Sequence, residues 1–322
     1  MDPERKLNHP GWCENLVRAG SLAQGERVLV VVDEPLAEEG AQLVAAVRDA
    51  GGEPRLELWA GERPLARPPD PILERAQTAE LALFLAQKPR ADEAGARFQL
   101  METVIGHGGR ELYLALVDGP LLAGDLSQPM PDLSEAAAQL LSAFEDVETV
   151  RVLAAAGTDL TLRVAGRPWR TDAVALSPGE AGNFPGGEIF VAPHADGADG
   201  VLLVDLTIPY TVEGFVDEPV TIRFEHGHAI SIEGGRAAQM LRELVADAGQ
   251  GADVIAELGI GLNSSITPRG HTMLDEKAAQ TAHVAIGRNT GVYGGDNEAS
   301  IHVDCVFSNP RFEADGRAVP LP

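Results

Sequence analysis

The stretch RVLVVVDEPLAEEGAQLVAAVRDAGGEPRLELW (residues 27–59) decides the architecture of the first half of the chain. A β-branched run, Arg27–Val32, follows the breaker Gly25. The helical spacing of Leu36–Ala50 ends at the Gly51–Gly52 pair, and Arg55–Trp59 has a second strand pattern. A strand, a helix and another strand in this order predict a mostly parallel sheet that helices cover on both faces.

The same alternation continues outward from this stretch. Apolar runs of strand length occur at Leu81–Leu85 and Leu112–Val117. Helical patterns lie near Pro71–Gln77, Ala91–Ile105 and Leu133–Phe144, and Asp132 is a candidate N-cap for the last of these. The first half is therefore predicted to be an α/β sheet domain.

After about residue 150 the pattern changes, because strand-like runs follow one another closely with glycine between them. One clear helical pattern remains, at Arg236–Ala248. We therefore predict an α/β protein, α+β overall, with an N-terminal α/β domain at residues 1–149 and a mixed, β-rich domain at residues 150–322. The strand-like runs are Val150–Ala154, Leu160–Val164, Glu188–Ala192, Val201–Leu206, Val220–Phe224 and Ala229–Glu233.

Composition narrows the class of partner. The 322 residues include 49 acidic and 25 basic side chains, for a net charge of −24. Such a surface repels phosphate backbones and anionic lipid, so we expect neither nucleic acid nor a membrane as partner. The two cysteines, Cys13 and Cys305, form no CxxC pair, and the polar start MDPERKLNHPGW is unlike a signal peptide. We expect a cytoplasmic protein.

Familiar nucleotide and hydrolase motifs are absent from the sequence. There is no GxGxxG after the first strand, no GxxxxGK[ST], no HExxH and no GxSxG. The α/β half therefore says little about function by itself.

Acidic residues and histidines gather in apolar, glycine-rich stretches of the second half. In SIHVD (300–304), His302 and Asp304 are two residues apart, so on a strand both side chains point to one face. Glu257 is the only charge in AELGIGLN (256–263), and burying it unpaired would be costly. Imidazole and carboxylate groups on a shared face are a common start for a metal site.

Each candidate also has a structural interpretation. Glu188 in NFPGGEIFVAP (183–193) can equally be a carboxylate at the end of a surface strand. Asp275 or Glu276, in LDEKAAQTAHVAIG (274–287), can cap the first turn of a helix. His283, in the same stretch, can be a satisfied core histidine. The residues alone thus indicate a metal site and leave its reaction open.

Six stretches in order resemble the thermophilic metalloaminopeptidase family (leucyl aminopeptidase T, aminopeptidase S). They are GTDLTLRVAGRPW (157–169), NFPGGEIFVAP, GHAISIEGG (227–235), AELGIGLN, LDEKAAQTAHVAIG and SIHVD. The resemblance implies a cleft in the C-terminal domain that holds two divalent cations: zinc, cobalt, manganese or magnesium. The implied ligands are Glu188, Glu257, Glu276, His283, His302 and Asp304, with Glu257 as the bridging ligand.

The resemblance also implies an enzyme that removes N-terminal residues from short peptides or acts on a similar small molecule, and that forms a homodimer. Glu257 and Glu188 are then the catalytic carboxylates as well as ligands, with the choice of general base left open. One departure concerns the family's tyrosine seven residues after the ligand histidine, where this chain has Thr290. Tyr293 lies close by as a candidate replacement.

Two other hypotheses remain. A related branch of the fold contains mononuclear iron(II) dioxygenases that open dihydroxypyridine rings, for which His283, His302 and Asp304 would suffice as a facial triad. The glutamates argue against this reading, because a single iron does not need them. A non-catalytic metal-binding protein of the same fold is the third hypothesis.

Overall fold

The computed structural model describes residues 9–173 and 175–322, and the chain divides into two compact units. The first unit comprises residues up to Met130 together with Ala175–Pro185, and the second comprises Pro131–Val174 with Gly186–Pro322. The sequence-based boundary near residue 150 lies later. The two divisions differ at helix α6 (Ser134–Ala143), which contacts strand β9 (Glu188–Val191) of the second unit. They differ also at Ala175–Pro185, which belongs to the first unit.

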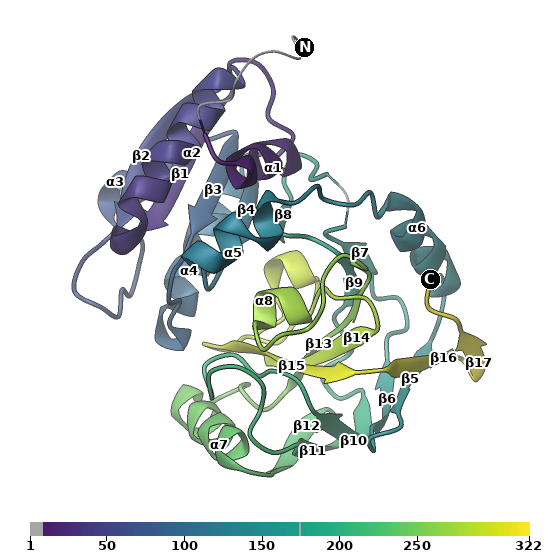
Figure 1. Ribbon diagram of the computed structural model, residues 1–322. Helices are drawn as coiled ribbons and strands as arrows, with labels where there is room; N and C mark the ends of the chain where they lie inside the picture. The colour runs from purple at the N-terminus through teal and green to yellow at the C-terminus, as the bar shows by residue number, and fades with distance from the viewer. Residues whose placement is uncertain (1–8, 174) are drawn as a thin grey trace. The chain divides into compact units, whose positions relative to one another are not determined.

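A five-stranded parallel sheet, of order β2-β1-β3-β4-β8, forms the first unit (Figure 1). The predicted strand–helix–strand stretch forms β1, α2 and β2, and Val31 pairs with Glu57 across the two strands. The strands are β1 Arg27–Asp33, β2 Glu53–Trp59, β3 Leu81–Leu85, β4 Arg110–Leu114 and β8 Ala181–Asn183. The helices are α1 Gly11–Ala19, α2 Ala37–Asp49, α3 Asp70–Ala76, α4 Ala94–Ile105 and α5 Gly119–Ala123, with short 3₁₀ turns at Glu34–Leu36, Ala91–Glu93 and Asp125–Ser127.

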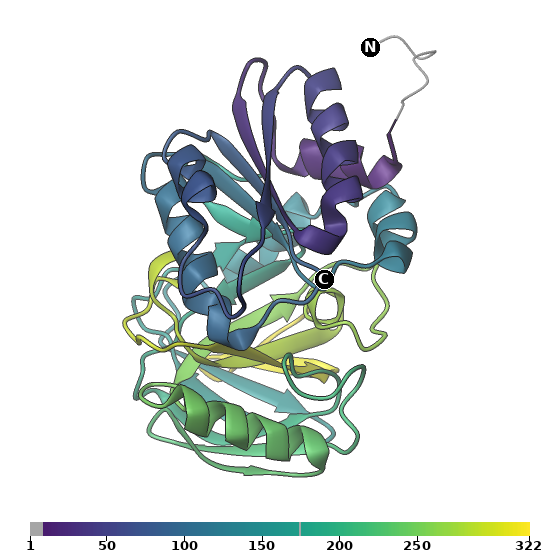
Figure 2. The ribbon, with the colours of Figure 1, turned by 90° about the vertical axis from the view of Figure 1, so that its left-hand side faces the viewer.

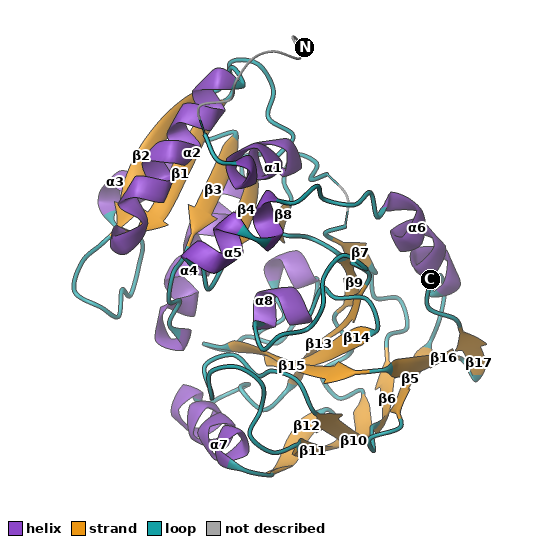
Figure 3. Cartoon of the chain, in the orientation of Figure 1, coloured by secondary structure: helices purple, strands orange, loops and turns teal. Residues whose placement is uncertain are grey.

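Helices cover both faces of this sheet, as predicted (Figure 3). Alternate residues of β1 point to opposite faces. Leu29 and Val31 pack with Phe84 and with α3 and α4 in one buried cluster. On the other face, α2 approaches so closely that a Cβ on Gly40 would lie 3.1 Å from Val32. The all-apolar run Val28–Val32 is thus explained by burial on both faces.

The strand predicted at Leu112–Val117 instead spans Arg110–Leu114. Leu116 has a φ of 56°, a left-handed conformation that ends an extended run. The sequence stays apolar beyond this point because Ala115 and Val117 are also buried, although they lie outside the strand. Apolar character alone therefore misplaced the strand.

The second unit is built largely of antiparallel strands (Figure 3). A seven-stranded sheet has the order β12-β11-β10-β6-β5-β16-β17, and a five-stranded sheet has the order β15-β14-β13-β9-β7. The first sheet contains β5 Thr149–Ala154, β6 Asp159–Arg163, β10 Ala198–Val204, β11 Val220–Glu225, β12 His228–Glu233, β16 Pro310–Ala314 and β17 Arg317–Val319. The second contains β7 Arg170–Thr171, β9 Glu188–Val191, β13 Ile255–Gly261, β14 Thr281–Gly287 and β15 His302–Ser308.

Few helices accompany these sheets. Helix α7 (Arg236–Ala248) has the predicted bounds and packs on β11 and β12 (Figure 2). The remaining turns are α8 (Thr272–Asp275) and the 3₁₀ turn Gly291–Tyr293. At α6 the cap residue is Leu133, while Asp132 accepts a hydrogen bond from the N–H of Ser134 at 3.0 Å. Within the described parts of the chain, no helix has both the length and the apolar character needed to cross a bilayer.

Glu111 is a buried carboxyl group in the middle of the first unit's sheet. It pairs with Ala82 on β3 and Ala181 on β8, and its Oε2 has no hydrogen-bond partner. Burial raises its pKa from 4.5 to about 8. The group is therefore protonated in the folded protein at pH 7 but ionised in the unfolded chain.

This difference predicts how Glu111 affects stability. Between pH 4.5 and about 8 the folded state binds the extra proton, so the free energy of unfolding falls as pH rises. Glu111→Gln removes that titration, and we expect it to raise the free energy of unfolding by roughly 1–3 kcal/mol at pH 8 and little at pH 4.5. Urea denaturation at both pH values measures the difference. Equal effects at the two pH values would contradict the assignment.

Candidate metal centre

Five of the six predicted site residues lie on one face of the second unit's five-stranded sheet, of order β15-β14-β13-β9-β7. Glu188 on β9 pairs with Gly261 of β13, and His283 on β14 pairs with Gly259. The other three follow from the same register, because directly paired residues share a face. Glu257 and Asp304 both pair with Ala285, and His302 pairs with Gly287.

A glycine or alanine stands opposite each of these five side chains. The effect is clearest at Gly259, where an added Cβ would lie 2.1 Å from Cε1 of His283. The imidazole therefore lies over the bare backbone of β13. The glycines that the sequence shows in AELGIGLN and HVAIG thus make room for the larger groups on neighbouring strands.

A β-bulge brings Glu257 onto this face. Ile255 pairs with Ile286 and Glu257 with Ala285, so Ala256 is an extra residue on β13. Residues two apart on a regular strand share a face, and the bulge breaks this rule between Ile255 and Glu257. As a result, Ile255 packs in the core while the Glu257 carboxylate joins the site.

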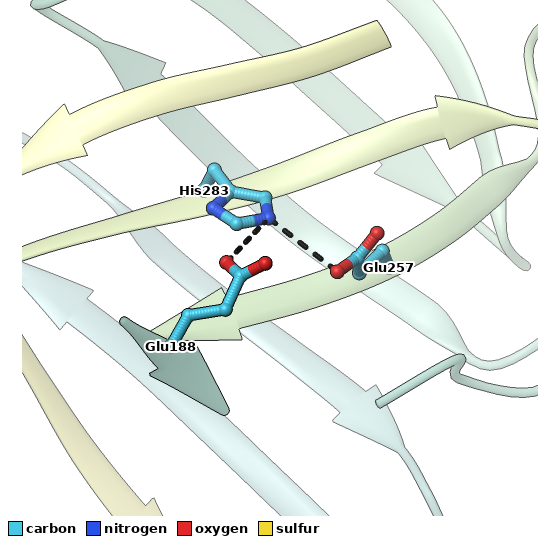
Figure 4. Close-up of side chains that lie close together, drawn as sticks. All are labelled: Glu188, Glu257 and His283. Atoms are coloured by element: carbon cyan, nitrogen blue, oxygen red, sulfur yellow. Dashed lines mark ion pairs between the residues drawn. The ribbon is translucent and has the colours of Figure 1, made fainter. Parts of the chain in front are cut away.

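Two groups that could hold a metal ion occur in the part of the chain that the structure describes, and Glu188, Glu257 and His283 form the first (Figure 4). Nε2 of His283 lies 3.6 Å from Oε2 of Glu188 and 3.5 Å from Oε1 of Glu257. All three side chains are buried. Figure 4 shows both carboxylates pointing toward the same nitrogen of the imidazole.

Glu257 also belongs to the second group, with His302 and Asp304. Nε2 of His302 lies 3.1 Å from Oε2 of Glu257 and 3.2 Å from Oδ1 of Asp304. Nδ1 of His302 is 2.7 Å from the carbonyl oxygen of Arg288. A neutral ring that donates from Nδ1 to this carbonyl keeps the Nε2 lone pair for a metal.

The spacing and chemistry of these atoms suit small divalent cations. Two ligands of a tetrahedral ion with bonds of about 2.1 Å are about 3.4 Å apart. The four contacts within the two groups lie between 3.1 and 3.6 Å. Mixed nitrogen and oxygen ligands suit zinc, cobalt, manganese or iron better than magnesium or calcium.

Lys277 is a functional residue that the sequence reasoning missed. It is fully buried, and its ammonium group contacts Oε1 of Glu188, Oδ2 of Asp172 at 3.1 Å and Oε1 of Glu276 at 3.3 Å. Although burial opposes the charge, Asp172 and the two glutamates raise the pKa of Lys277 well above its usual value. Because Lys277 holds one oxygen of Glu188, the other is left to face His283.

A signal for Lys277 does exist in the sequence. The chain has only three lysines against 22 arginines, and one of them stands in the LDEKAAQ stretch. Asp172 was less visible, because it lies outside the glycine-rich stretches. Its Oδ1 accepts hydrogen bonds from the N–H groups of Gly187 and Glu188, which fixes the start of β9.

Glu276 is not part of either three-residue group. It follows α8 rather than opening a helix, so the predicted first turn at DEKAAQ is wrong. Asp275 instead uses its carboxylate on the backbone N–H groups of residues 269–271. Burial, opposed by Lys277, raises the pKa of Glu276 to about 7.

Electrostatics on this face favour positive charge. Burial alone would lower the pKa of His283, but the carboxylates of Glu188 and Glu257 raise it to about 10. Burial raises the pKa of Glu188 despite Lys277 and His283. The carboxylates that hold a proton on His283 also attract metal ions.

Two aromatic rings border the centre. Tyr293 stacks on the imidazole of His302, with ring centroids 4.4 Å apart and planes 17° from parallel. Its ring also meets that of Phe190 edge-on at 6.2 Å. Tyr293, the candidate replacement for the family's tyrosine, thus lies against His302. Cys305 is buried and pairs with Val284, so it points to the opposite face.

Comparisons with known proteins lead to two kinds of enzyme. Residues 125–320 match the family model described as 2,5-dihydroxypyridine 5,6-dioxygenase. Aminopeptidase T of Thermus thermophilus is 30% identical over 180 residues, which cover 50% of this chain and 43% of that protein. The match thus spans less than half of this relative's length. It confirms the resemblance found in the sequence.

Solved structures give the fold. The 2,5-dihydroxypyridine dioxygenase of Pseudomonas putida superposes with a TM-score of 0.73 at 21% identity, over 96% of this chain and 94% of the other. Wild-type AmpT of Thermus thermophilus superposes with a TM-score of 0.70 at 18% identity, over 97% and 96%. These likenesses confirm the predicted α/β fold class. Each superposition covers nearly the whole length of both chains.

The close approach of His283 to β13 gives a test of the centre. In Gly259→Ala the new methyl group would lie 2.1 Å from Cε1 of His283, so the imidazole must turn away from Glu188 and Glu257. We expect metal content to fall at least twofold, with a stability loss of roughly 1–3 kcal/mol from overpacking. Elemental analysis and thermal unfolding measure the two effects.

Gly95→Ala is a matched control, because a Cβ at that position meets nothing within 4 Å. It should leave metal content unchanged. Wild-type metal content in Gly259→Ala would show that the imidazole is not a ligand.

Proposed function

The chain belongs to the family whose model is described as 2,5-dihydroxypyridine 5,6-dioxygenase. From the two ligand groups and from the 30% identity to aminopeptidase T over half of the chain, we propose that it is a metal-dependent aminopeptidase acting on short peptides. Glu257 carries the proposal, because it belongs to both ligand groups. A carboxylate that faces two groups, one through each oxygen, is what a bridged pair of ions needs. In this proposal Glu188 and His283 complete one position, and His302 and Asp304 complete the other.

The balance of buried charge supports two ions rather than one. Five carboxylates lie in or beside the centre: Asp172, Glu188, Glu257, Glu276 and Asp304. Lys277 offsets one of them, which leaves four negative charges when all five carboxylates are ionised, as bound cations favour, and both histidines are neutral. Two divalent ions would balance these charges, whereas one would leave two of them uncompensated, at a high cost for buried groups.

The chain's own residues prepare the proposed reaction. When bound, the ions lower the pKa of a water and polarise the scissile carbonyl. In hydrolysis the C–N bond breaks, a C–O bond forms at the carbonyl carbon, and the leaving amine gains a proton. Lys277 holds Oε1 of Glu188. One of the two catalytic carboxylates, Glu188 or Glu257, accepts the water's proton and passes it to the leaving amine. Glu276 stays in the proposed ligand set on the resemblance alone.

The second candidate is an iron(II) ring-opening dioxygenase, which the family model and the Pseudomonas structure favour. It would use His283, His302 and Asp304. Nε2 of His283 does lie 3.8 Å from Oδ1 of Asp304. However, neither group found among the described residues contains both histidines, and this argues against the triad. A homodimer, expected from the resemblance, stays a prediction under either reading.

Metal content and substrate together separate the two functions. We expect protein reconstituted with zinc, cobalt or manganese to hold about two ions per chain, the number of a two-metal site, and to release the N-terminal residue of short peptides. Elemental analysis and an amine-release assay measure this. One iron per chain, with oxygen uptake on a dihydroxypyridine and no peptide hydrolysis, would overturn the proposal.

Glu257→Ala tests the bridging role directly. We expect loss of both ions and of hydrolysis with the fold largely retained. Each of the two ligand groups would lose one of its three members, because Glu257 belongs to both. Glu233→Ala, on strand β12 of the other sheet, is the control and should keep both. If Glu257→Ala still binds a full complement of metal, Glu257 is not a ligand; in the iron reading it should keep its iron.

A further inference from the structure

Arg170 lies on the metal-binding face of the sheet, at its edge. It belongs to β7 and pairs directly with Phe190 of β9, which in turn pairs with Gly259 of β13. His283 is the next member of this row. Because paired residues share a face, Arg170, Phe190 and the His283 imidazole all project to the same side.

The side chain of Arg170 confirms this direction. A Cβ built on Gly294 would lie 3.3 Å from one Nη atom and 3.5 Å from Nε of Arg170. Gly294 follows Tyr293, the residue that stacks on His302. The guanidinium group therefore lies along the loop that borders the centre.

Arg170 has no acidic partner in this position, in contrast to its neighbour. Arg167 contacts the same loop and forms a bidentate ion pair with Asp296. For Arg170, no carboxylate oxygen of residues 9–173 and 175–322 lies within the 4.0 Å of an ion pair. In a chain with 49 acidic and 25 basic residues, the exposed guanidinium is left available for another anion.

The distance from the strand that carries Arg170 to the centre matches a short peptide. Two strand spacings of about 4.8 Å separate the backbone of Arg170 from that of Gly259, over which the His283 ring lies, so the span is about 10 Å. An extended peptide covers about 3.3–3.6 Å per residue. Two or three residues therefore cover the span from the centre to strand β7, and the half-buried Phe190 lies on the same face between the two.

We propose that Arg170 binds the C-terminal carboxylate of the substrate, which makes di- and tripeptides with a free carboxylate the substrate class. The inference rests on the proposed hydrolytic function. A guanidinium and a carboxylate form two parallel hydrogen bonds, so recognition depends on both the charge and the planar shape. Arg170 positions the substrate and takes no part in bond breaking.

Kinetics on a matched pair of substrates test this role. We expect the free acid Leu-Gly-Gly to be hydrolysed with a kcat/KM about 10- to 100-fold above that of its C-terminal amide. Arg170→Gln should abolish this preference, mainly through KM, and Arg170→Lys should restore part of it. Arg223→Gln removes an exposed arginine from β11 of the other sheet and should keep the preference. Equal kcat/KM for acid and amide in the wild type would overturn the inference.

A binding measurement separates this inference from the proposed function. Calorimetry with a non-hydrolysable ketomethylene isostere of Leu-Gly-Gly, as acid and as amide, needs no turnover. Tighter binding of the acid that is lost in Arg170→Gln but kept in Arg223→Gln supports Arg170 even if no peptide is cleaved. Equal binding of acid and amide, or the same preference in Arg170→Gln, would refute the role of Arg170 whatever the protein hydrolyses.

Discussion

The burial of several carboxylates beside one sheet is the constraint on which the second unit depends. Ionised carboxylates removed from water destabilise a fold unless cations compensate them. Among the described residues, Lys277 is a buried cation that compensates this charge, and it contacts three of the acids. The remaining charge is carried by protons on the histidines or by metal ions. We therefore expect bound cations to stabilise this unit.

The backbone of the second unit's five-stranded sheet leaves space for these charged side chains. Glycine and alanine on β13 and β14 stand opposite the larger groups, so the imidazoles and carboxylates crowd together without steric conflict. On the opposite face, Leu258, Ile260 and Cys305 are buried as ordinary core. One sheet therefore serves as a hydrophobic layer on one side and as a ligand support on the other. Rigid strands suit such a task better than loops, because their positions are fixed by two neighbours.

The sequence predicted much of this arrangement, and for physical reasons. The two-residue spacing in SIHVD and the lone charge in AELGIGLN are local signals, and the structure brings His302, Asp304 and Glu257 together. Glu188 and Glu276 were ambiguous because their surroundings depend on Lys277, which is distant from Glu188 in sequence. The end of the strand before Leu116 was missed because the left-handed backbone of that residue opposes the apolar pattern. The helix start expected at DEKAAQ was wrong because these residues end the short helix α8 or follow it.

The bulge at Ala256 has a consequence for how the centre is inherited. Pairing is in register up to Ile255, and the extra residue lies between it and the glutamate. Deleting Ala256 would leave Ile255 opposite Ile286 and the glutamate opposite Ala285, so the carboxylate would still face the ligands. A homologue can therefore lose the bulge and keep the centre. In alignments of such proteins, a one-residue gap just before this glutamate would not mark a lost centre, whereas replacement of the glutamate would.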